Sequence, residues 1–220
     1  MKNNLIFLFS FLALDLLQAQ GTFQNLDFEQ ANIVPLGGSD TNEVEASAAL
    51  PGWTVYLGGS SVNYVLYDTV SLGSPAVSIQ DSLSPVAQPL QGSYSVVLQH
   101  SGIDSTTAGI GQTGQLPQNA ASITFYVANY QTLQLTFAGN SIPLVQLGTT
   151  ANYSVYGGNI APYAGQTGEL LFTDIANNSQ PMELDNIQFS SSVPEPSAFG
   201  LFALGSLFFG LRRWRKPWMT

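Results

Sequence analysis

The sequence has no cysteine among its 220 residues. Disulfide bonds, thiolate chemistry and cysteine-ligated zinc sites are therefore excluded. Charged residues are also scarce: they make up 9% of the chain, whereas about a quarter is typical of soluble proteins. The solubility of this protein must therefore depend on Ser, Thr, Asn, Gln and Gly.

Positive charge is confined to the two ends of the chain. Setting Asp15 and Glu195 aside from the 14 acidic residues leaves 12 in the region between the ends, which contains no Lys or Arg. Nucleic acid is excluded as a partner because nothing in this region can neutralise phosphates. Each carboxylate there must be solvated, hydrogen-bonded or bound to a cation. The five basic residues are Lys2, Arg212, Arg213, Arg215 and Lys216.

Residues 1–19 have the order of a secretory signal peptide. A polar start with one Lys precedes an apolar run from Leu5 to Leu14, and small residues follow up to Ala19. We expect a signal-peptide helix here, with cleavage after Ala19. Asp15 and Leu17 depart from the usual pattern and leave the exact bond open. A retained N-terminal anchor is the alternative.

The C-terminal segment has three parts. Pro194 and Pro196 hold the first part extended and exposed. The apolar run that follows is somewhat shorter than the about 17–25 residues of a usual membrane span, and Ser197 and Trp214 extend it. We therefore expect a transmembrane helix whose basic end stays in the cytoplasm, with the rest of the protein outside. The alternative is an amphipathic or buried helix, but apolar residues would cover every face of it. The parts are the motif 193–197 (beginning Val193, Pro194, Glu195, Pro196), the run Ala198 to Leu211, and the basic end 212–216.

This three-part order resembles the PEP-CTERM sorting signal of Gram-negative bacteria. The resemblance implies export across the inner membrane, recognition by an exosortase and processing near the Pro-Glu-Pro motif. It also implies a cell-surface or extracellular location and a role linked to exopolysaccharide or biofilm matrix. The chain then divides into a signal peptide at 1–19, a domain at 20–192 and a sorting signal at 193–216.

The central region predicts an all-β fold. Apolar and polar residues alternate in short runs that Gly, Pro, Asn and Ser separate, and helical periodicity is limited to about one turn at residues 160–164. This spacing favours an antiparallel β-sandwich of the jelly-roll type. The expected strands lie at residues 53–57, 62–67, 94–98, 110–116, 123–127, 133–137, 144–147, 169–172 and 184–189.

Two short segments resemble the galactose-binding-like jelly roll of several carbohydrate-binding modules. One is Asn25-Leu26-Asp27-Phe28-Glu29 near the start of the domain, and the other is Glu183-Leu184-Asp185-Asn186-Ile187 near its end. The resemblance implies that the first and last strands lie together and hold a structural Ca²⁺, with Glu29 and Asp185 as ligands and Asp27 as a weaker one. Calcium suits a domain that offers carboxylates without basic partners. Solvated strand or turn positions are the alternative for these three residues.

Exposed aromatic rings are the candidates for glycan binding, because sugar rings stack on them while Asn, Gln and Asp supply hydrogen bonds. Trp53 follows Pro-Gly at the start of an expected strand, which favours a core position. For each tyrosine the pattern favours neither a glycan-binding nor a core position, because tyrosine often buries its ring while its hydroxyl stays in water. The candidate tyrosines are Tyr56, Tyr64, Tyr67, Tyr130, Tyr153, Tyr156 and Tyr163, and the first four are nominated as ligand-binding residues.

Catalysis has little support in the sequence. His100 is the only histidine, and Ser101 and Asp104 follow it, but no Gly-x-Ser-x-Gly elbow is present and proximity in sequence is not triad geometry. We expect a turn there and no catalytic residue. The sequence predicts an exported, non-catalytic surface or matrix protein that binds glycan such as exopolysaccharide. The alternatives are a purely structural or adhesive protein and, less favoured, a polysaccharide hydrolase.

Overall fold

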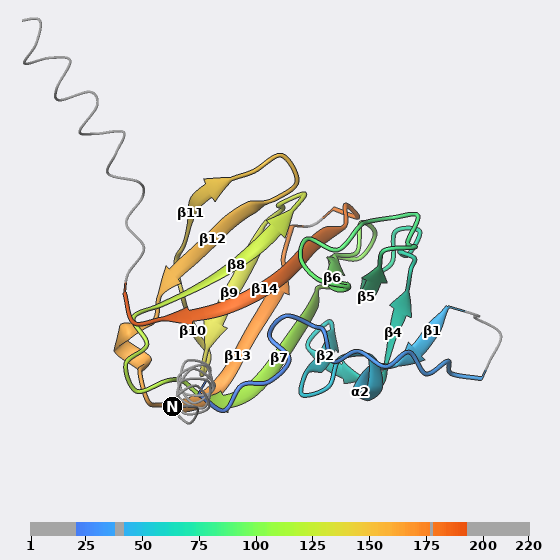
Figure 1. The fold of residues 1–220 in the computed structure, drawn as a ribbon. Helices are drawn as coiled ribbons and strands as arrows, with labels where there is room; N and C mark the ends of the chain where they lie inside the picture. The colour runs from blue at the N-terminus through green and yellow to red at the C-terminus, as the bar shows by residue number, and fades with distance from the viewer. Residues whose placement is uncertain (1–20, 38–41, 177, 193–220) are drawn as a thin grey trace, which may run out of the picture.

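The structure, a computed structural model, describes residues 21–37, 42–176 and 178–192. The expected signal peptide, sorting motif, transmembrane helix and basic end all lie outside the described residues. Among the described residues, no helix is long and apolar enough to cross a membrane. Two β-sheets pack face to face (Figure 1). The predicted antiparallel β-sandwich is confirmed.

One sheet has eight strands and the other has six. Described strands pair antiparallel except β4 with β5. The eight-stranded sheet runs in the order β1 (Glu43–Glu45), β4 (Tyr64–Tyr67), β5 (Ala76–Asp81), β6 (Tyr94–Gln99), β14 (Met182–Ser190), β8 (Ser122–Ala128), β12 (Ser154–Asn159) and β11 (Leu144–Thr149). The six-stranded sheet runs β10 (Asn140–Ser141), β9 (Leu133–Phe137), β13 (Thr167–Asp174), β7 (Ala108–Gln115), β2 (Thr54–Leu57) and β3 (Ser60–Val62). Two short helical turns are α2 (Ala46–Ala49) and η1 (Ala161–Tyr163).

The chain crosses repeatedly from one sheet to the other, which is the jelly-roll arrangement. Strand β6 belongs to the eight-stranded sheet, β7 to the six-stranded sheet, β8 to the first again and β9 to the second. Alternate residues of each strand point between the sheets, as the period of two in the sequence predicts. Phe125 of β8 meets Phe172 of β13 edge to face, with ring centroids 5.2 Å apart.

Trp53 lies in this core, as its position in the sequence favours. Its side chain is 5% exposed, and its indole N–H donates to the carbonyl oxygen of Asn25 at 2.9 Å. The ring also lies against Phe28 and Phe172. Trp53 therefore ties the first described segment of the chain to the six-stranded sheet and is not available to a ligand.

Several strands differ from the expectation. The run expected at residues 62–67 is divided, because Val62 ends β3 and Tyr64 begins β4. Strands β5 and β12 were not expected. The β12 sequence contains Gly157 and Gly158, which weaken a strand pattern. The structure explains both glycines: a Cβ at Gly157 would stand 2.8 Å from the Ile123 carbonyl oxygen, and one at Gly158 would stand 2.5 Å from Cγ2 of Ile142.

Candidate functional site

The outer face of the eight-stranded sheet is partly covered by the chain itself. The segment Ser82–Ser93, which joins β5 to β6, folds over this face and will be called the covering loop. Ser84 of this loop is buried and donates to Oε1 of Gln80 at 2.5 Å, and the backbone N–H of Gln91 donates to Oδ2 of Asp185 at 2.7 Å. The loop therefore encloses polar side chains that point away from the core: Ser78, Gln80, Ser95, Glu183 and Asp185 are all buried.

Two carboxyl groups of β14 lie within this enclosed row. Glu183 accepts a short hydrogen bond from the Ser95 hydroxyl, and burial raises the pKa of its carboxyl to about 7. Burial also raises the pKa of Asp185 to about 8, and the negative charges of Glu183 and Glu29 add to that effect. Hydrogen bonds from the N–H groups of Gln91 and Asn186 act in the opposite direction. Both groups therefore hold protons at a pH where exposed carboxyls have lost them.

The structure brings two of the three expected calcium ligands to one place. Oε1 of Glu29 accepts the N–H groups of Ser93 at 2.7 Å and Tyr94 at 3.1 Å, and Ser93 is two residues after Gln91, which donates to Asp185. Asp27 is exposed, and its Oδ1 accepts the N–H of Glu29 at 3.5 Å. The first segment also lies against the last strand, since the N–H of Ile187 donates to the carbonyl oxygen of Leu26 at 2.9 Å.

The carboxylates of Glu29 and Asp185 are the type of ligand that calcium prefers, but they are fewer than the ligands that a calcium ion needs. Carboxylate oxygens are the ligands that Ca²⁺ prefers, and a cation would offset the burial of negative charge at Asp185. Across the part of the chain that the structure describes, no three His, Asp or Glu side chains lie where they could share a metal ion. Glu29 and Asp185 would hold the ion, and backbone carbonyl oxygens or water would have to complete its shell of about six to eight ligands.

The uncovered part of the same outer face carries a pair of stacked tyrosines. The rings of Tyr126, on β8, and Tyr153, just before β12, are 4.2 Å apart and 15° from parallel. Tyr126 stands opposite Asp185 in the strand register, and the next pair on this face is Thr124 with Gln188. The amide of Gln188 donates to Oδ1 of Asn186 at 2.8 Å. We call Tyr126, Tyr153, Thr124 and Gln188 the aromatic strip. The strip combines ring faces with uncharged hydroxyl and amide groups.

Tyr126 is not among the tyrosines predicted from the sequence to bind a ligand. A signal was present, because Tyr126 lies between two apolar residues of an expected strand, Phe125 and Val127, which are both buried. The alternation of that strand already placed the tyrosine on the opposite face. Its partner Tyr153 is one of the candidate tyrosines of the sequence, but their stacking could not be predicted, since Tyr153 comes to Tyr126 only through the pairing of β12 with β8.

The four tyrosines that the sequence analysis nominated are not brought together. Tyr56 lies on the outer face of the other sheet and donates to Oε1 of Glu169 at 2.7 Å. Tyr67 packs against the core and donates to Oδ2 of Asp81 at 2.5 Å, and this hydrogen bond raises the pKa of the phenol. Tyr64 is half-buried on β4. The fourth, Tyr130, stacks on Tyr156 with ring centroids 4.3 Å apart.

His100 occupies a turn after β6, as expected. Its ring Nδ1 lies 2.5 Å from the carbonyl oxygen of Ser101, and its backbone N–H donates to Oδ2 of Asp174. The Ser101 hydroxyl oxygen accepts the N–H groups of Ile103 and Asp104. These contacts organise the loop that follows β6.

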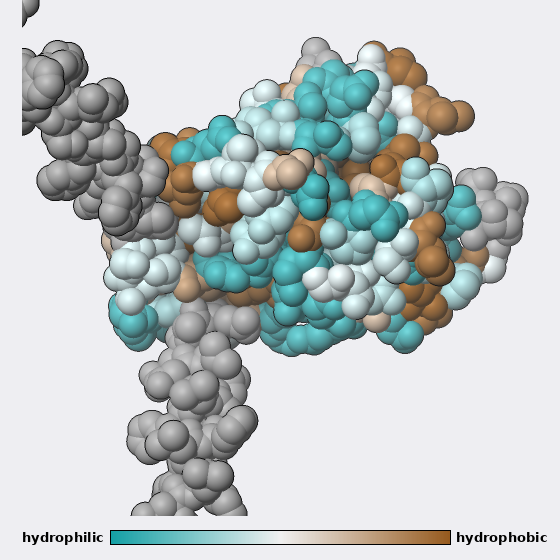
Figure 2. Space-filling model, turned by 45° about the horizontal axis from the view of Figure 1, so that its top comes forward, coloured by the Kyte–Doolittle hydropathy of each residue, from teal (hydrophilic) through white to brown (hydrophobic). Residues whose placement is uncertain are grey.

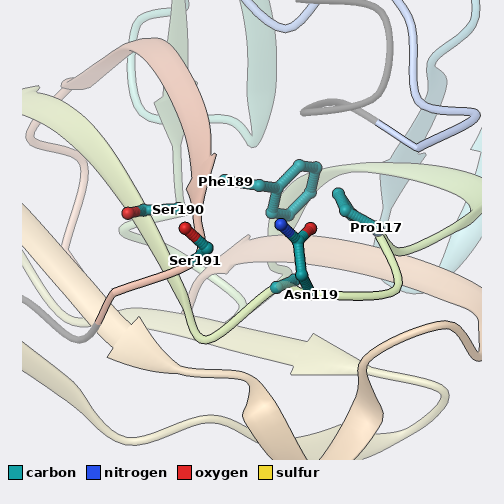
Figure 3. A pocket seen from close by; sticks show the side chains of 6 residues that line it. Pro117, Asn119, Phe189, Ser190 and Ser191 are labelled. Carbon is teal, nitrogen blue, oxygen red and sulfur yellow. The ribbon is translucent and has the colours of Figure 1, made fainter. Parts of the chain in front are cut away.

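An open pocket of about 240 Å³ lies at the end of the sandwich where β14 finishes. Figure 3 shows the Phe189 ring close to Pro117 and Asn119, with Ser190 and Ser191 alongside. Its lining residues carry no charge. On the face of the molecule seen in Figure 2, hydrophobic side chains occur in separate small groups with hydrophilic ones between them, so a single large apolar patch is not seen on that face.

Comparison with solved structures returns distant likenesses. The tailspike protein 4 enzymatically active domain of bacteriophage CBA120 has a TM-score of 0.43 and 15% identity over 77% of this chain and 21% of its own. The family 11 carbohydrate-binding module from Clostridium thermocellum has a TM-score of 0.39 and 10% identity over 70% of this chain and 97% of its own. The carbohydrate-binding module TmCBM61 in complex with β-1,4-galactotriose has a TM-score of 0.39 and 13% identity over 78% and 99%.

No curated protein sequence matches the chain. The chain spans about a fifth of the phage tailspike domain, at 21% of its length. One family model matches, that of the PEP-CTERM protein-sorting motif, over residues 192–216. This range agrees within one residue with the segment that the sequence predicts. The protein therefore carries a PEP-CTERM sorting motif at its C-terminal end.

Proposed function

We propose that this protein is an exported, non-catalytic binder of neutral glycans. Export and a C-terminal membrane anchor before processing follow from the sorting motif. The glycan-binding part of the proposal is supported by the aromatic strip, where the stacked Tyr126 and Tyr153 stand beside Thr124 and Gln188. Aromatic faces pack on the C–H faces of sugar rings, and amide and hydroxyl groups hydrogen-bond the sugar hydroxyls.

The charge of the domain favours neutral polymers over acidic ones. The region between the two targeting segments has 12 acidic residues and no Lys or Arg. A polyanionic exopolysaccharide would be repelled by this surface, and no guanidinium or ammonium group is available to pair with its charges. The strip itself contributes uncharged groups, which suit a neutral exopolysaccharide of the matrix.

Titration calorimetry with a panel of soluble neutral polysaccharides, including β-glucan, galactan and mannan, tests the proposal. We expect binding to at least one of them by the intact domain, and reduced binding when Tyr153 is replaced by alanine. An acidic polysaccharide such as alginate serves as the matched negative. If no neutral glycan binds, the protein has a purely structural or adhesive role, which is the second candidate.

Exosortase is the partner that the sorting motif implies, and processing would release the domain from its anchor to the cell surface or matrix of a Gram-negative bacterium. Within the domain, calcium between Glu29 and Asp185 is part of the proposal as a structural ion. It would fix the position of the covering loop at Gln91–Tyr94, which both carboxylates reach. A polysaccharide hydrolase remains the minor alternative, and a release assay for reducing sugar on the bound glycan separates it from simple binding.

A further inference from the structure

Both described termini lie at one end of the sandwich (Figure 1). The N–H of Thr22 donates to the carbonyl oxygen of Gln115 at 3.0 Å, and the Ser122 hydroxyl donates to the carbonyl oxygen of Ser192 at 2.7 Å. Further hydrogen bonds join Ala121 to Ser190 and to Ile160 at the same end. The two targeting segments are therefore attached to the same end of the domain.

This end, which we call the terminal face, carries no charged side chain. It comprises residues 21–22, 115–121, 160–167 and 189–192, none of which is acidic or basic. The nearest carboxylates along the chain are Glu169, two residues beyond Thr167, Glu195, three residues beyond Ser192, and Asp185, four residues before Phe189. The uncharged pocket beside Phe189 belongs to this face.

The length of the connecting segment sets how far this face can be from a membrane. Only residues 193–197 separate Ser192 from the apolar run. Five residues span at most about 18 Å when fully extended. While the run is in a bilayer, the terminal face must therefore lie within about that distance of the bilayer surface, whatever the conformation of the connecting residues.

Charge decides which surface should face the lipid. A carboxylate pressed against a bilayer loses water and is repelled by anionic headgroups over about a Debye length, roughly 8 Å at physiological salt. Strand β14, nine residues long, spans roughly 27 Å between its ends. When the terminal face is turned toward the bilayer, residues at the opposite end of the sandwich, such as Asp174 and Met182, lie farther from the lipid by about the length of this strand.

We propose that the terminal face is the surface that rests against the lipid bilayer while the C-terminal segment anchors the precursor. Its uncharged exposed residues, which include Gln118, Asn119, Ala161 and Pro162, suit the membrane–water interface, and the half-buried Tyr163 lies beside them. The aromatic strip is then held away from the lipid. Strand β12 ends at the terminal face, where Asn159 pairs with Ser122, and Tyr153 precedes its first residue, Ser154, which pairs with Val127 at the opposite end. The proposal does not depend on glycan binding.

The full chain in vesicles of phosphatidylcholine and phosphatidylglycerol provides the test. Because the sequence has no cysteine, a single introduced cysteine carries an environment-sensitive fluorophore without ambiguity. Asn119→Cys places it on the terminal face, and Asn152→Cys places it on the exposed β11–β12 turn at the opposite end. A lipid with a spin label on its headgroup then quenches whichever fluorophore lies near the surface.

We expect at least threefold stronger quenching at position 119 than at position 152. Adding Gln118→Glu should reduce quenching at position 119 by about half on these anionic vesicles, whereas Asn152→Asp should leave it unchanged. Equal quenching at the two positions, or stronger quenching at 152, overturns the proposal. Absence of quenching at both also overturns it and would point to a protein, such as the processing enzyme, as the occupant of this face.

Discussion

Glu29 and Asp185, from the first and last described segments of the domain, hold the same four-residue stretch, Gln91–Tyr94, where the covering loop enters β6. Asp185 accepts the N–H of Gln91, and Glu29 accepts those of Ser93 and Tyr94. The first and last segments of the domain thus meet through a third segment that belongs to neither. The following predictions test this contact and the aromatic strip beside it.

Replacing Glu29 should loosen the covering loop. Glu29→Ala leaves the N–H groups of Ser93 and Tyr94 without their acceptor, and we expect a loss of about 1–3 kcal/mol in the free energy of unfolding. Hydrogen exchange should accelerate at these two amides. The exposed Asp27→Ala is the matched control and should cost less than about 0.5 kcal/mol. Equal losses in the two variants would contradict the loop contact.

Gly92 should tolerate a side chain less well than a glycine with similar backbone geometry. Gly92 has φ +66° and Gly59 has φ +78°, so alanine is strained at either position. Only at Gly92 would the new Cβ collide with the Glu29 carboxylate, whereas Gly59 has no atom within 4 Å. Gly59→Ala should cost about 1 kcal/mol. Gly92→Ala should cost more, and urea denaturation of the two variants measures the difference.

Stability should fall as the pH rises. The pKa values of Asp185 and Glu183, raised from 3.8 and 4.5 to about 8 and about 7, mean that the folded state binds more protons than the unfolded state between these limits. The free energy of unfolding should therefore decrease between about pH 4 and about pH 8, by on the order of a few kcal/mol. Asp185→Asn should remove most of this slope, and Asp27→Asn should not change it.

Calcium should act on the same carboxylates. If Glu29 and Asp185 bind Ca²⁺, millimolar calcium raises the melting temperature near pH 8, where Asp185 can lose its proton, and has less effect near pH 5. A chelator should reverse the shift, and Asp185→Asn should abolish it. A melting temperature that does not respond to calcium at either pH would remove the ion from the proposal.

The aromatic strip should contribute directly to glycan affinity. Tyr153→Ala and Tyr126→Ala should each weaken binding of the selected polysaccharide roughly tenfold, which corresponds to about 1.4 kcal/mol of lost ring contact. Tyr153→Phe should retain most of the affinity, because the ring remains. Tyr56→Phe, on the outer face of the other sheet, is the control. If only Tyr56 or Tyr130 variants lose affinity, the site lies elsewhere.

The strand pattern and the motif segments were open to prediction because both are local. Alternation at residues 123–127 and 133–137 corresponds to β8 and β9, and the pairing of the first segment with the last strand agrees with the resemblance that nominated Glu29 and Asp185. Strand β12 was not predicted because its two glycines have no side chains and so interrupt the alternation of apolar and polar residues. The burial of Glu183 was not predicted because an acidic residue in a strand is normally solvated, and here the covering loop buries it.

The sequence by itself determined the separation of charge, the sorting motif and the two-sheet class of fold, since each depends on composition or on neighbours within a few residues. Tertiary structure alone decided which carboxyls are buried, which tyrosines share a face and which end of the domain carries both termini. These depend on strand order and on the path of the covering loop. The free energy that selects them comes from contacts between residues far apart in the chain, which no local pattern records.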